Sequence, residues 1–450
     1  MIFLLVILAI ALGIFYYIVT LDIAGYLKFF LAAGEMLAVG QFLISRYKLS
    51  GEYGLILLKS QKGLELINRI AKKEELWKFL SDSGAVLSYG FLSILLMRKN
   101  ISLKTFISGM VLLSAIFFFV APSVLPFLAG TIGINTVEKG VVQSSTLSIV
   151  ASVSVLLLYA GGLFLILLLS ILAYGAFILS ALLSTLLHGT QAIAKAAPGG
   201  TFLLPGINLP FFEGIAALIV ILIVHEGAHA ILARIAKIPV LSSGIVLFGF
   251  LPVGAFVEPD EEKLKKLDRT KQTRVLVAGS TANLLTSLVF FIIFLGFFYG
   301  TSQYREDGLL VLSGMEKNTV IHAVDGKPVS AGNYRDLQLP KNGEVTLLTN
   351  KGEIVRKTNE DGKIGITLAP ITKDSINSVY DFWPLQFIYI FLGLCFSLNF
   401  VIGSVNLLPL PFFDGYRTLE INIENKYVVK GVMALTFIAF LINFLPWFFK

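Results

Sequence analysis

The chain has 450 residues, of which 56% are hydrophobic and only 14% are charged, and its mean hydropathy is +0.82. A soluble globular protein carries about a quarter charged residues, so this composition excludes a soluble chain and indicates several membrane spans. The formal charge of +7 implies no nucleic-acid partner, because lysine and arginine cluster in short loops, as in the cytoplasmic loops of membrane proteins. The single cysteine, Cys395, excludes an intrachain disulfide and a cysteine-rich metal site.

In chain order, the predicted elements begin with apolar runs long enough to cross a bilayer. The first run lacks the basic start and small-residue cleavage site of a signal peptide, so we expect a retained span. The fourth run is long enough for a tight hairpin of two crossings, broken near Gly161-Gly162 or Gly175. We therefore expect a polytopic α-helical membrane protein of about nine spans. The runs are Met1–Val19, Ile23–Ile44, Phe106–Leu128, Ile149–Leu187, Phe211–Ile235, Val275–Tyr299, Trp383–Leu408 and Val428–Phe449.

Residues 1–200 are predicted to form an N-terminal membrane region. Within it, the basic segment 46–104 is expected in the cytoplasm, with the short apolar piece Gly84–Met97 at the membrane interface. The charged loop Glu258–Arg274 belongs on the same side by the same rule. These assignments place the two polar loops together at the cytoplasmic face.

Residues 301–381 differ in kind, because they are polar and contain short β-like runs punctuated by glycine. They are predicted to form one small β-rich domain outside the membrane. This domain separates two groups of core spans, in residues 201–300 and 382–450. Within the first group, segment 242–257 is too short to span and is rich in β-branched residues and glycine. We expect it to form a membrane-embedded β-hairpin.

The run Phe211–Ile235 contains the sequence H-E-x-x-H, formed by His225, Glu226 and His229. On a helix, two histidines four residues apart project from nearly one face, about 40° apart. That spacing lets two imidazoles hold one zinc ion, with the glutamate placed as the base that takes a proton from water. Ionisable groups at membrane depth are rare and usually functional, so the sequence predicts a zinc site here.

A catalytic zinc needs a third protein ligand, and no histidine or carboxylate follows the second histidine before Glu258. Asp414 stands out by its setting, "NLLPLPFFDGY", where two prolines interrupt the end of a span. Non-helical backbone at membrane depth is tolerated only where it is buried in protein or lines a water-filled cavity. An ordinary helix end with a surface aspartate is the alternative. The carboxylates considered, in or beside apolar runs, are Asp22, Glu35, Glu138, Glu213 and Asp414.

Taken together, these features resemble the site-2 protease family of intramembrane metalloproteases. H-E-x-x-H in one span is followed by Asn-x-x-Pro and Asp-Gly in another, with a small domain between them. "GFLPVGAFVEP" (Gly249–Pro259) is similar to the hairpin after the first motif. "VAGSTANLLTSL" (Val277–Leu288) resembles the family's Ala-Gly-x-x-x-Asn span, and "LLPGINLPF" (Leu203–Phe211) resembles the entry to the first motif. The resemblance covers Leu203 to the C-terminus.

The resemblance implies zinc ligands His225, His229 and Asp414, with Glu226 as the general base and Asn406 helping to hold the substrate backbone or the oxyanion. The usual Leu-Asp-Gly reads Phe-Asp-Gly here, an apolar exchange that leaves ligation untouched. Asn283 is interpreted as a helix-packing or hydrogen-bonding residue. The external domain resembles an abbreviated PDZ domain. We interpret it as a spacer or filter in preference to a domain that binds a specific peptide.

The resemblance further implies a multi-pass protein of the lipid bilayer, in the cell membrane if the organism is a prokaryote. Its substrates would be single-span membrane proteins already trimmed outside by another protease. From the helix rise, we expect the zinc about 14 Å below the cytoplasmic surface, and we expect the hairpin edge to pair with an unwound substrate. Three alternatives are a transporter or channel, a non-proteolytic relative that binds transmembrane helices, and an ordinary zinc protease facing solvent.

Overall fold

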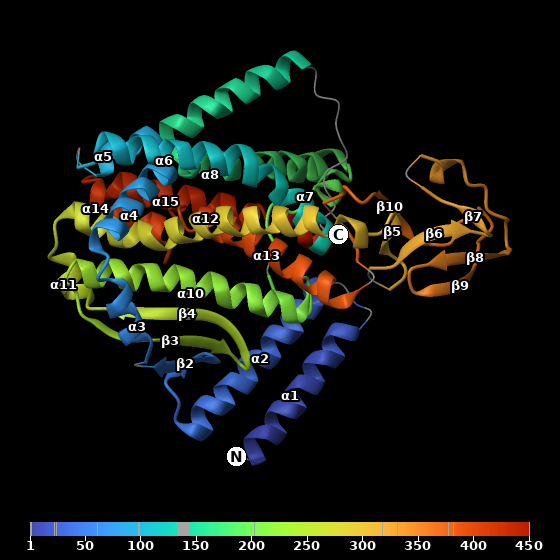
Figure 1. Ribbon diagram of the computed structural model, residues 1–450, viewed down its shortest axis with the longest axis horizontal. Coiled ribbons are helices and arrows are strands. Elements are labelled where there is room, and N and C mark those ends of the chain that lie inside the picture. The colour runs from blue at the N-terminus through green and yellow to red at the C-terminus, as the bar shows by residue number, and fades with distance from the viewer. Residues whose placement is uncertain are drawn as a thin grey trace.

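The computed structural model describes residues 2–449 except 22, 24, 61, 98, 99, 133–143, 202, 317, 331, 377 and 381. Over this part of the chain, nine helices are long and apolar enough to cross a membrane. The protein is a polytopic helical membrane protein with a small β-rich domain, as its composition predicts. Figure 1 shows the helices packed side by side, with the β-rich domain projecting from one end of the bundle.

Three long helices form the centre of the molecule, and each packs against the other two. Helix α12 starts after Asp268, whose side chain accepts a hydrogen bond from the Lys271 amide at 3.0 Å, a typical N-terminal cap. An aromatic cluster fills the space beside α12 and α13, where the ring centroids of Phe294 and Phe396 lie 5.0 Å apart. The central helices are α10 (Phe211–Ile235), α12 (Arg269–Gly300) and α13 (Trp383–Val405).

The other helices surround this centre. Helix α14 follows α13 after a turn, and α15 packs against α8. Helices α1 and α2 lie together beside the hairpin, where the rings of Phe15 and Phe250 meet edge to face at 5.8 Å. These helices are α1 (Ile2–Thr20), α2 (Gly25–Tyr47), α3 (Lys62–Ile70), α5 (Ser93–Leu96), α6 (Leu103–Ala115), α7 (Ala121–Ile132), α9 (Ala192–Lys195), α11 (Glu261–Lys265), α14 (Asp414–Asn422) and α15 (Lys426–Ile442).

The predicted hairpin is present as β3 (Val240–Phe248) and β4 (Leu251–Pro259), which pair antiparallel and lie alongside α10. The reversal between them uses Gly249 in the left-handed region, with φ of 61°. A Cβ at this position would lie 2.8 Å from the Met36 sulfur. Glycine is therefore needed here both for the turn and for the close approach of α2.

The hairpin belongs to a larger sheet than its sequence predicts. Two strands from the N-terminal region, β1 (Gly51–Glu52) and β2 (Leu55–Ser60), extend it into a four-stranded antiparallel sheet with the order β1-β2-β3-β4. Strand β2 pairs with β3 over its whole length, from Leu55 opposite Phe248 to Ser60 opposite Ser243. The outer edge of β3 is therefore occupied from within the chain, whereas β4 forms the opposite edge of the sheet.

Helix α4 (Glu74–Tyr89) is buried over its second half, packed against α12, α6 and α8. The sequence places Gly84–Met97 at the interface, and the structure corrects this prediction. Asp82 pairs with Arg274 at the start of α12, and Asn100, beyond the apolar piece, donates to Thr270 at 3.1 Å. Both contacts lie in the first two turns of α12, so the segment between them enters the bundle and returns to the same end.

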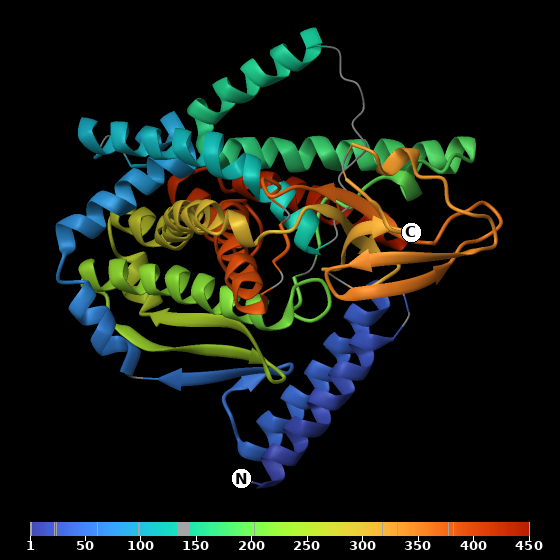
Figure 2. The same cartoon turned by 45° about the vertical axis from the view of Figure 1, so that its right-hand side comes forward.

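Helix α8 (Ser144–His188) reverses at Gly162, where φ is 64° and ψ is −162°. Figures 1 and 2 show its two arms diverging as a V. The predicted break near Gly161-Gly162 is confirmed, and the alternative at Gly175 is not used. A Cβ on Gly162 would collide with the backbone at Ser88, so the absence of a side chain lets the turn after α4 pack into the apex of the V.

The β-rich domain contains six antiparallel strands in the order β10-β5-β6-β8-β9, with β7 paired to β6. Its core includes Leu309, Ile321 and Leu347, which are almost fully buried. The likeness to a PDZ domain stays a prediction. The strands are β5 (Gly308–Ser313), β6 (Val320–Val324), β7 (Lys327–Pro328), β8 (Glu344–Thr349), β9 (Gly352–Lys357) and β10 (Thr367–Ile371).

Candidate metal centre

His225 and His229 lie one turn apart on α10, on the face turned toward α12, and His225 is 92% buried. Their rings meet edge to face with centroids 4.8 Å apart. The helix is apolar on both sides of this pair, so the two imidazoles sit among buried side chains rather than in bulk water. The four-residue spacing thus places both ligand nitrogens at one point on the helix surface.

Asp414 reaches the same point because the chain turns sharply after α13. Phe412 adopts a left-handed conformation with φ of 72°, and the Gly415 amide donates to the Asn406 carbonyl at 2.9 Å. A Cβ at residue 415 would overlap the Leu407 carbonyl, so only glycine fits after the aspartate. The folded-back turn delivers Asp414, the first residue of α14, to the histidines of α10.

Three ligand atoms converge at this point. The Nε2 atoms of His225 and His229 are 3.2 Å apart, and Oδ2 of Asp414 lies 3.3 Å and 3.1 Å from them. A tetrahedral zinc ion with bonds of about 2.1 Å separates neighbouring ligand atoms by about 3.4 Å. The three groups therefore fit the coordination that zinc prefers. Among the described residues, no other group of three histidine, cysteine or acidic side chains comes together in this way.

Each histidine also has a hydrogen-bond partner at Nδ1, on the side of the ring away from the ligand atom. Nδ1 of His229 lies 2.7 Å from the Val275 carbonyl, and Nδ1 of His225 lies 3.1 Å from the Asn283 carboxamide. Metal-binding histidines usually make such a second hydrogen bond, which fixes the ring. Gly279 completes the setting, because a Cβ there would lie 2.6 Å from Nε2 of His225. The residues from α12 were not predicted as part of the site, although the Ala-Gly-x-x-x-Asn pattern contains two of them.

Glu226 points to the hairpin. Its Oε2 accepts a hydrogen bond from the Val257 amide at 3.1 Å, which connects α10 to β4. The Glu226 carboxylate is thus held next to β4, the unpaired edge strand of the sheet. In the sequence it directly follows the candidate ligand His225. Because Val257 donates away from β3, the edge-facing backbone groups of β4 include those of residues 257 and 255.

The other predicted carboxylates lie elsewhere. Glu213 is in the first turn of α10, about 18 Å along the helix from His225 by the helix rise. Both oxygens of Glu35 on α2 are buried without a hydrogen-bond partner. Asp22 and Glu138 fall outside the described residues. Asn406 contributes its carbonyl to the turn before Asp414, while its predicted contact with substrate stays a prediction.

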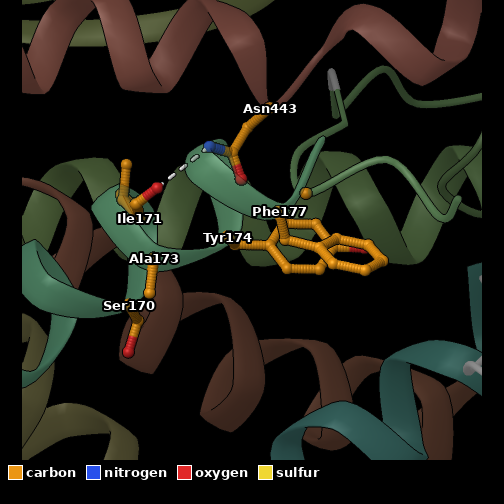
Figure 3. A pocket seen from close by; sticks show the side chains of 7 residues that line it. Ser170, Ile171, Ala173, Tyr174, Phe177 and Asn443 are labelled. Carbon is orange, nitrogen blue, oxygen red and sulfur yellow. Dashed lines mark hydrogen bonds between the residues drawn. The ribbon is translucent and has the colours of Figure 1, made fainter. Parts of the chain in front are cut away.

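Two hollows lie beyond the ligands. One, of about 550 Å³, lies between α8 and α15 and contains none of the centre's residues. Figure 3 shows the Asn443 amide bonded to the Ile171 carbonyl there. The second, of about 490 Å³, continues from the end of β4 and is lined by Leu241 and residues 256–262. The carboxyl of Glu258, one of its lining residues, is exposed, and its pKa is lowered mainly by the hydrogen bond from the Ser242 hydroxyl and then by the charge of Lys59.

Comparison with known proteins shows the family to which this chain belongs. The model of peptidase family M50 matches residues 213–445, more than half of the chain. An uncharacterized protein of Methanocaldococcus jannaschii is 32% identical over 248 residues, which cover 52% of this chain and 62% of that relative. The match thus spans less than two thirds of the relative's length. No solved structure matches significantly. The chain belongs to peptidase family M50, the family of the site-2 proteases.

Proposed function

We propose that this protein is an intramembrane zinc metalloprotease that hydrolyses peptide bonds within or near the transmembrane helices of its substrates. The observation that carries the proposal is the convergence of His225, His229 and Asp414, from α10 and α14, with Glu226 next to them. Family membership supports peptidase chemistry. The buried setting among apolar helices supports a reaction inside the bilayer.

The three ligands would hold zinc, which when bound supplies a Lewis acid for the scissile carbonyl and for water. Glu226 would take the proton from the attacking water and deliver it to the leaving amine. The Val257 amide fixes one carboxylate oxygen, which leaves the other for proton transfer. Asn406, in the turn before Asp414, is proposed to bind the substrate backbone or the oxyanion.

The sheet supplies a means of holding an extended substrate. A transmembrane helix must lose its internal hydrogen bonds before it can be cut, so the enzyme has to satisfy the freed backbone groups. The free edge of β4 offers such groups at Ala255, next to the amide that holds Glu226. We propose that an unwound segment of a single-span substrate pairs with this edge by strand addition. Prior trimming by another protease remains part of this proposal.

The test is cleavage of a model single-span substrate in liposomes by the wild type and by Glu226→Gln, with zinc content measured for both. We expect the variant to keep its zinc and to lose about 10²–10⁴-fold in rate, the range of general base catalysis. Glu213→Gln is the matched control, because it changes the same residue type on the same helix away from the ligands. Its rate should stay near wild type.

Each outcome has a meaning for the proposal. Cleavage inside the span by the wild type and by Glu213→Gln, but not by Glu226→Gln, supports the protease. An inactive wild type that contains zinc would favour a non-proteolytic relative that binds helices. A wild type that binds no zinc would remove the metal centre, and the transporter alternative, with the buried carboxylate of Glu35, would become the one to test.

A further inference from the structure

Asn283 lies behind the metal centre on α12 and is fully buried. Its Nδ2 is 3.1 Å from Nδ1 of His225, while its Oδ1 is buried without a hydrogen-bond partner. Leaving a carboxamide oxygen unpaired in a buried site costs about 1–3 kcal/mol. The buried Oδ1 of Asn283 therefore suggests a hydrogen-bond donor that pairs with it in another state of the site.

The donor and acceptor roles of the His225 ring supply that partner. When Nε2 of a neutral imidazole binds a metal, the ring proton resides on Nδ1. Nδ1–H would then face the amide N–H of Asn283, two donors at hydrogen-bond distance. A rotation of the carboxamide by 180° exchanges its nitrogen and its oxygen, so that the unpaired Oδ1 accepts the ring proton. This orientation removes the clash of donors and pairs the oxygen with the ring proton, while Nδ2 takes the buried position that the oxygen held before.

His229 provides the comparison within the same site. Its Nδ1 already faces an acceptor, the Val275 carbonyl, at 2.7 Å. A backbone carbonyl keeps this role whatever side chain is present, so His229 is oriented for metal binding by the helix itself. For His225, the partner of Nδ1 among the described residues is the side chain of Asn283. One ligand is thus oriented by the backbone and the other by a side chain that substitution can remove.

We infer that Asn283 is a positioning residue for zinc, which turns its carboxamide oxygen toward Nδ1 of His225 when the metal binds and so holds the ring with Nε2 facing the ion. The inference rests on the zinc centre of the proposed function and extends it to a residue that touches neither metal nor substrate. Loss of such an outer hydrogen bond typically weakens metal affinity about 10–100-fold.

The experiment measures zinc affinity of the purified full-length chain in detergent, by competition with a chromophoric chelator. Asn283→Leu removes the acceptor at similar volume, and Asn283→Asp restores an acceptor. Asn399→Leu is the matched control, because Asn399 is also fully buried, donates to a carbonyl through Nδ2 and carries an unpaired Oδ1, and it has no contact with a ligand. The thermal unfolding of each metal-free variant is measured alongside.

We expect zinc to bind Asn283→Leu about 10–100-fold more weakly than wild type, and to bind Asn283→Asp and Asn399→Leu within a few-fold of wild type, although both leucine variants lose stability. Wild-type affinity in Asn283→Leu, or an equal loss in Asn399→Leu, would overturn the inference and leave a packing role. If Asn283→Leu does not fold, Asn283→Ala carries the same expectation. A wild type that binds no zinc would overturn the proposed metal centre itself, which is a separate result.

Discussion

Gly279 on α12 lies against both imidazoles of the metal centre. A Cβ at this position would lie 2.5 Å from Cε1 and 2.6 Å from Nε2 of His225, closer than real side-chain contacts allow. We expect Gly279→Ala to push the ligands apart and to weaken zinc binding about 10–100-fold, as when ligand orientation is lost. Zinc titration of the purified variant measures this.

Gly296, on the same helix, is the control for that substitution, because a Cβ there meets nothing within 4 Å. Alanine is favoured over glycine in a helix by about 1 kcal/mol, so Gly296→Ala should keep wild-type zinc affinity and gain slightly in stability. Equal zinc affinity in both variants would show that the close contact at Gly279 is relieved by small shifts of the backbone.

Prediction from sequence reached the groups that would touch the ion but not those around them. His225, Glu226 and His229 follow from spacing alone, since four residues on a helix fix their relative direction. Asp414 was identified by its proline-broken setting and by resemblance, and the structure brings it to the histidines. The contacts of Gly279 and Asn283 with the histidines depend on the way α12 crosses α10, so the Ala-Gly-x-x-x-Asn pattern contains both residues without showing that they face the ligands.

At the scale of elements, helix α4 is fastened to α12 by an ion pair. Arg274 donates from Nε and Nη2 to the two oxygens of Asp82 at 2.6 Å and 2.8 Å, and the two side chains are 80% and 90% buried. Asp82→Asn leaves the guanidinium without a counter-charge, so we expect a loss of about 3–5 kcal/mol in the free energy of unfolding. Denaturant titration in detergent micelles measures it.

The matched control for this pair is Glu75→Gln on the same helix. Glu75 is 91% exposed and lies 3.5 Å from Lys78, so its removal should change the free energy of unfolding by about 0.5 kcal/mol or less. Should Asp82→Asn prove as mild as this control, α4 would be held by its apolar contacts alone.

The elements show where reasoning from sequence ends. The long helices and the hairpin were predicted, because length, apolar content and glycine spacing are local properties. Strand β2 was not, since its six residues lie in a basic segment and pair with β3 nearly 190 residues later in the chain. The path of the segment after α4, which turns back to the end of the bundle where it entered, was also not predicted. Composition does not distinguish a segment that crosses the membrane from one that turns back.

At the scale of the whole molecule, the contacts of α4 with the first turns of α12 lead to a prediction of topology. Both ends of segment 46–104 are expected on the same side of the membrane as the loop 258–274, with the β-rich domain on the other side. The chain suits a labelling test, because its single cysteine is buried and can be replaced by serine. In that background, we expect Lys72→Cys and Lys265→Cys to react with an impermeant thiol reagent from the same side, and Lys341→Cys from the opposite side.

Labelling of Lys72→Cys from the side of Lys341→Cys would mean that α4 crosses the bilayer, contrary to its contacts with the first turns of α12. Sealed vesicles of both orientations provide the measurement, with each variant serving as the control for the others. The result would also give the side of the membrane on which the start of α4 lies, in a region that precedes the family match at residue 213.

The pairing of β2 with β3 limits how many extended chains can bind to the sheet at one time. An uncovered sheet edge recruits any extended chain that reaches it, and a bare hairpin would have two such edges in the membrane. Here one edge is filled by the protein's own strand, and the far side of the sheet ends in the two residues of β1. If substrates pair with β4 as proposed, two extended substrates would therefore compete for this one edge rather than bind together, and β4 is the long edge that stays open to another chain.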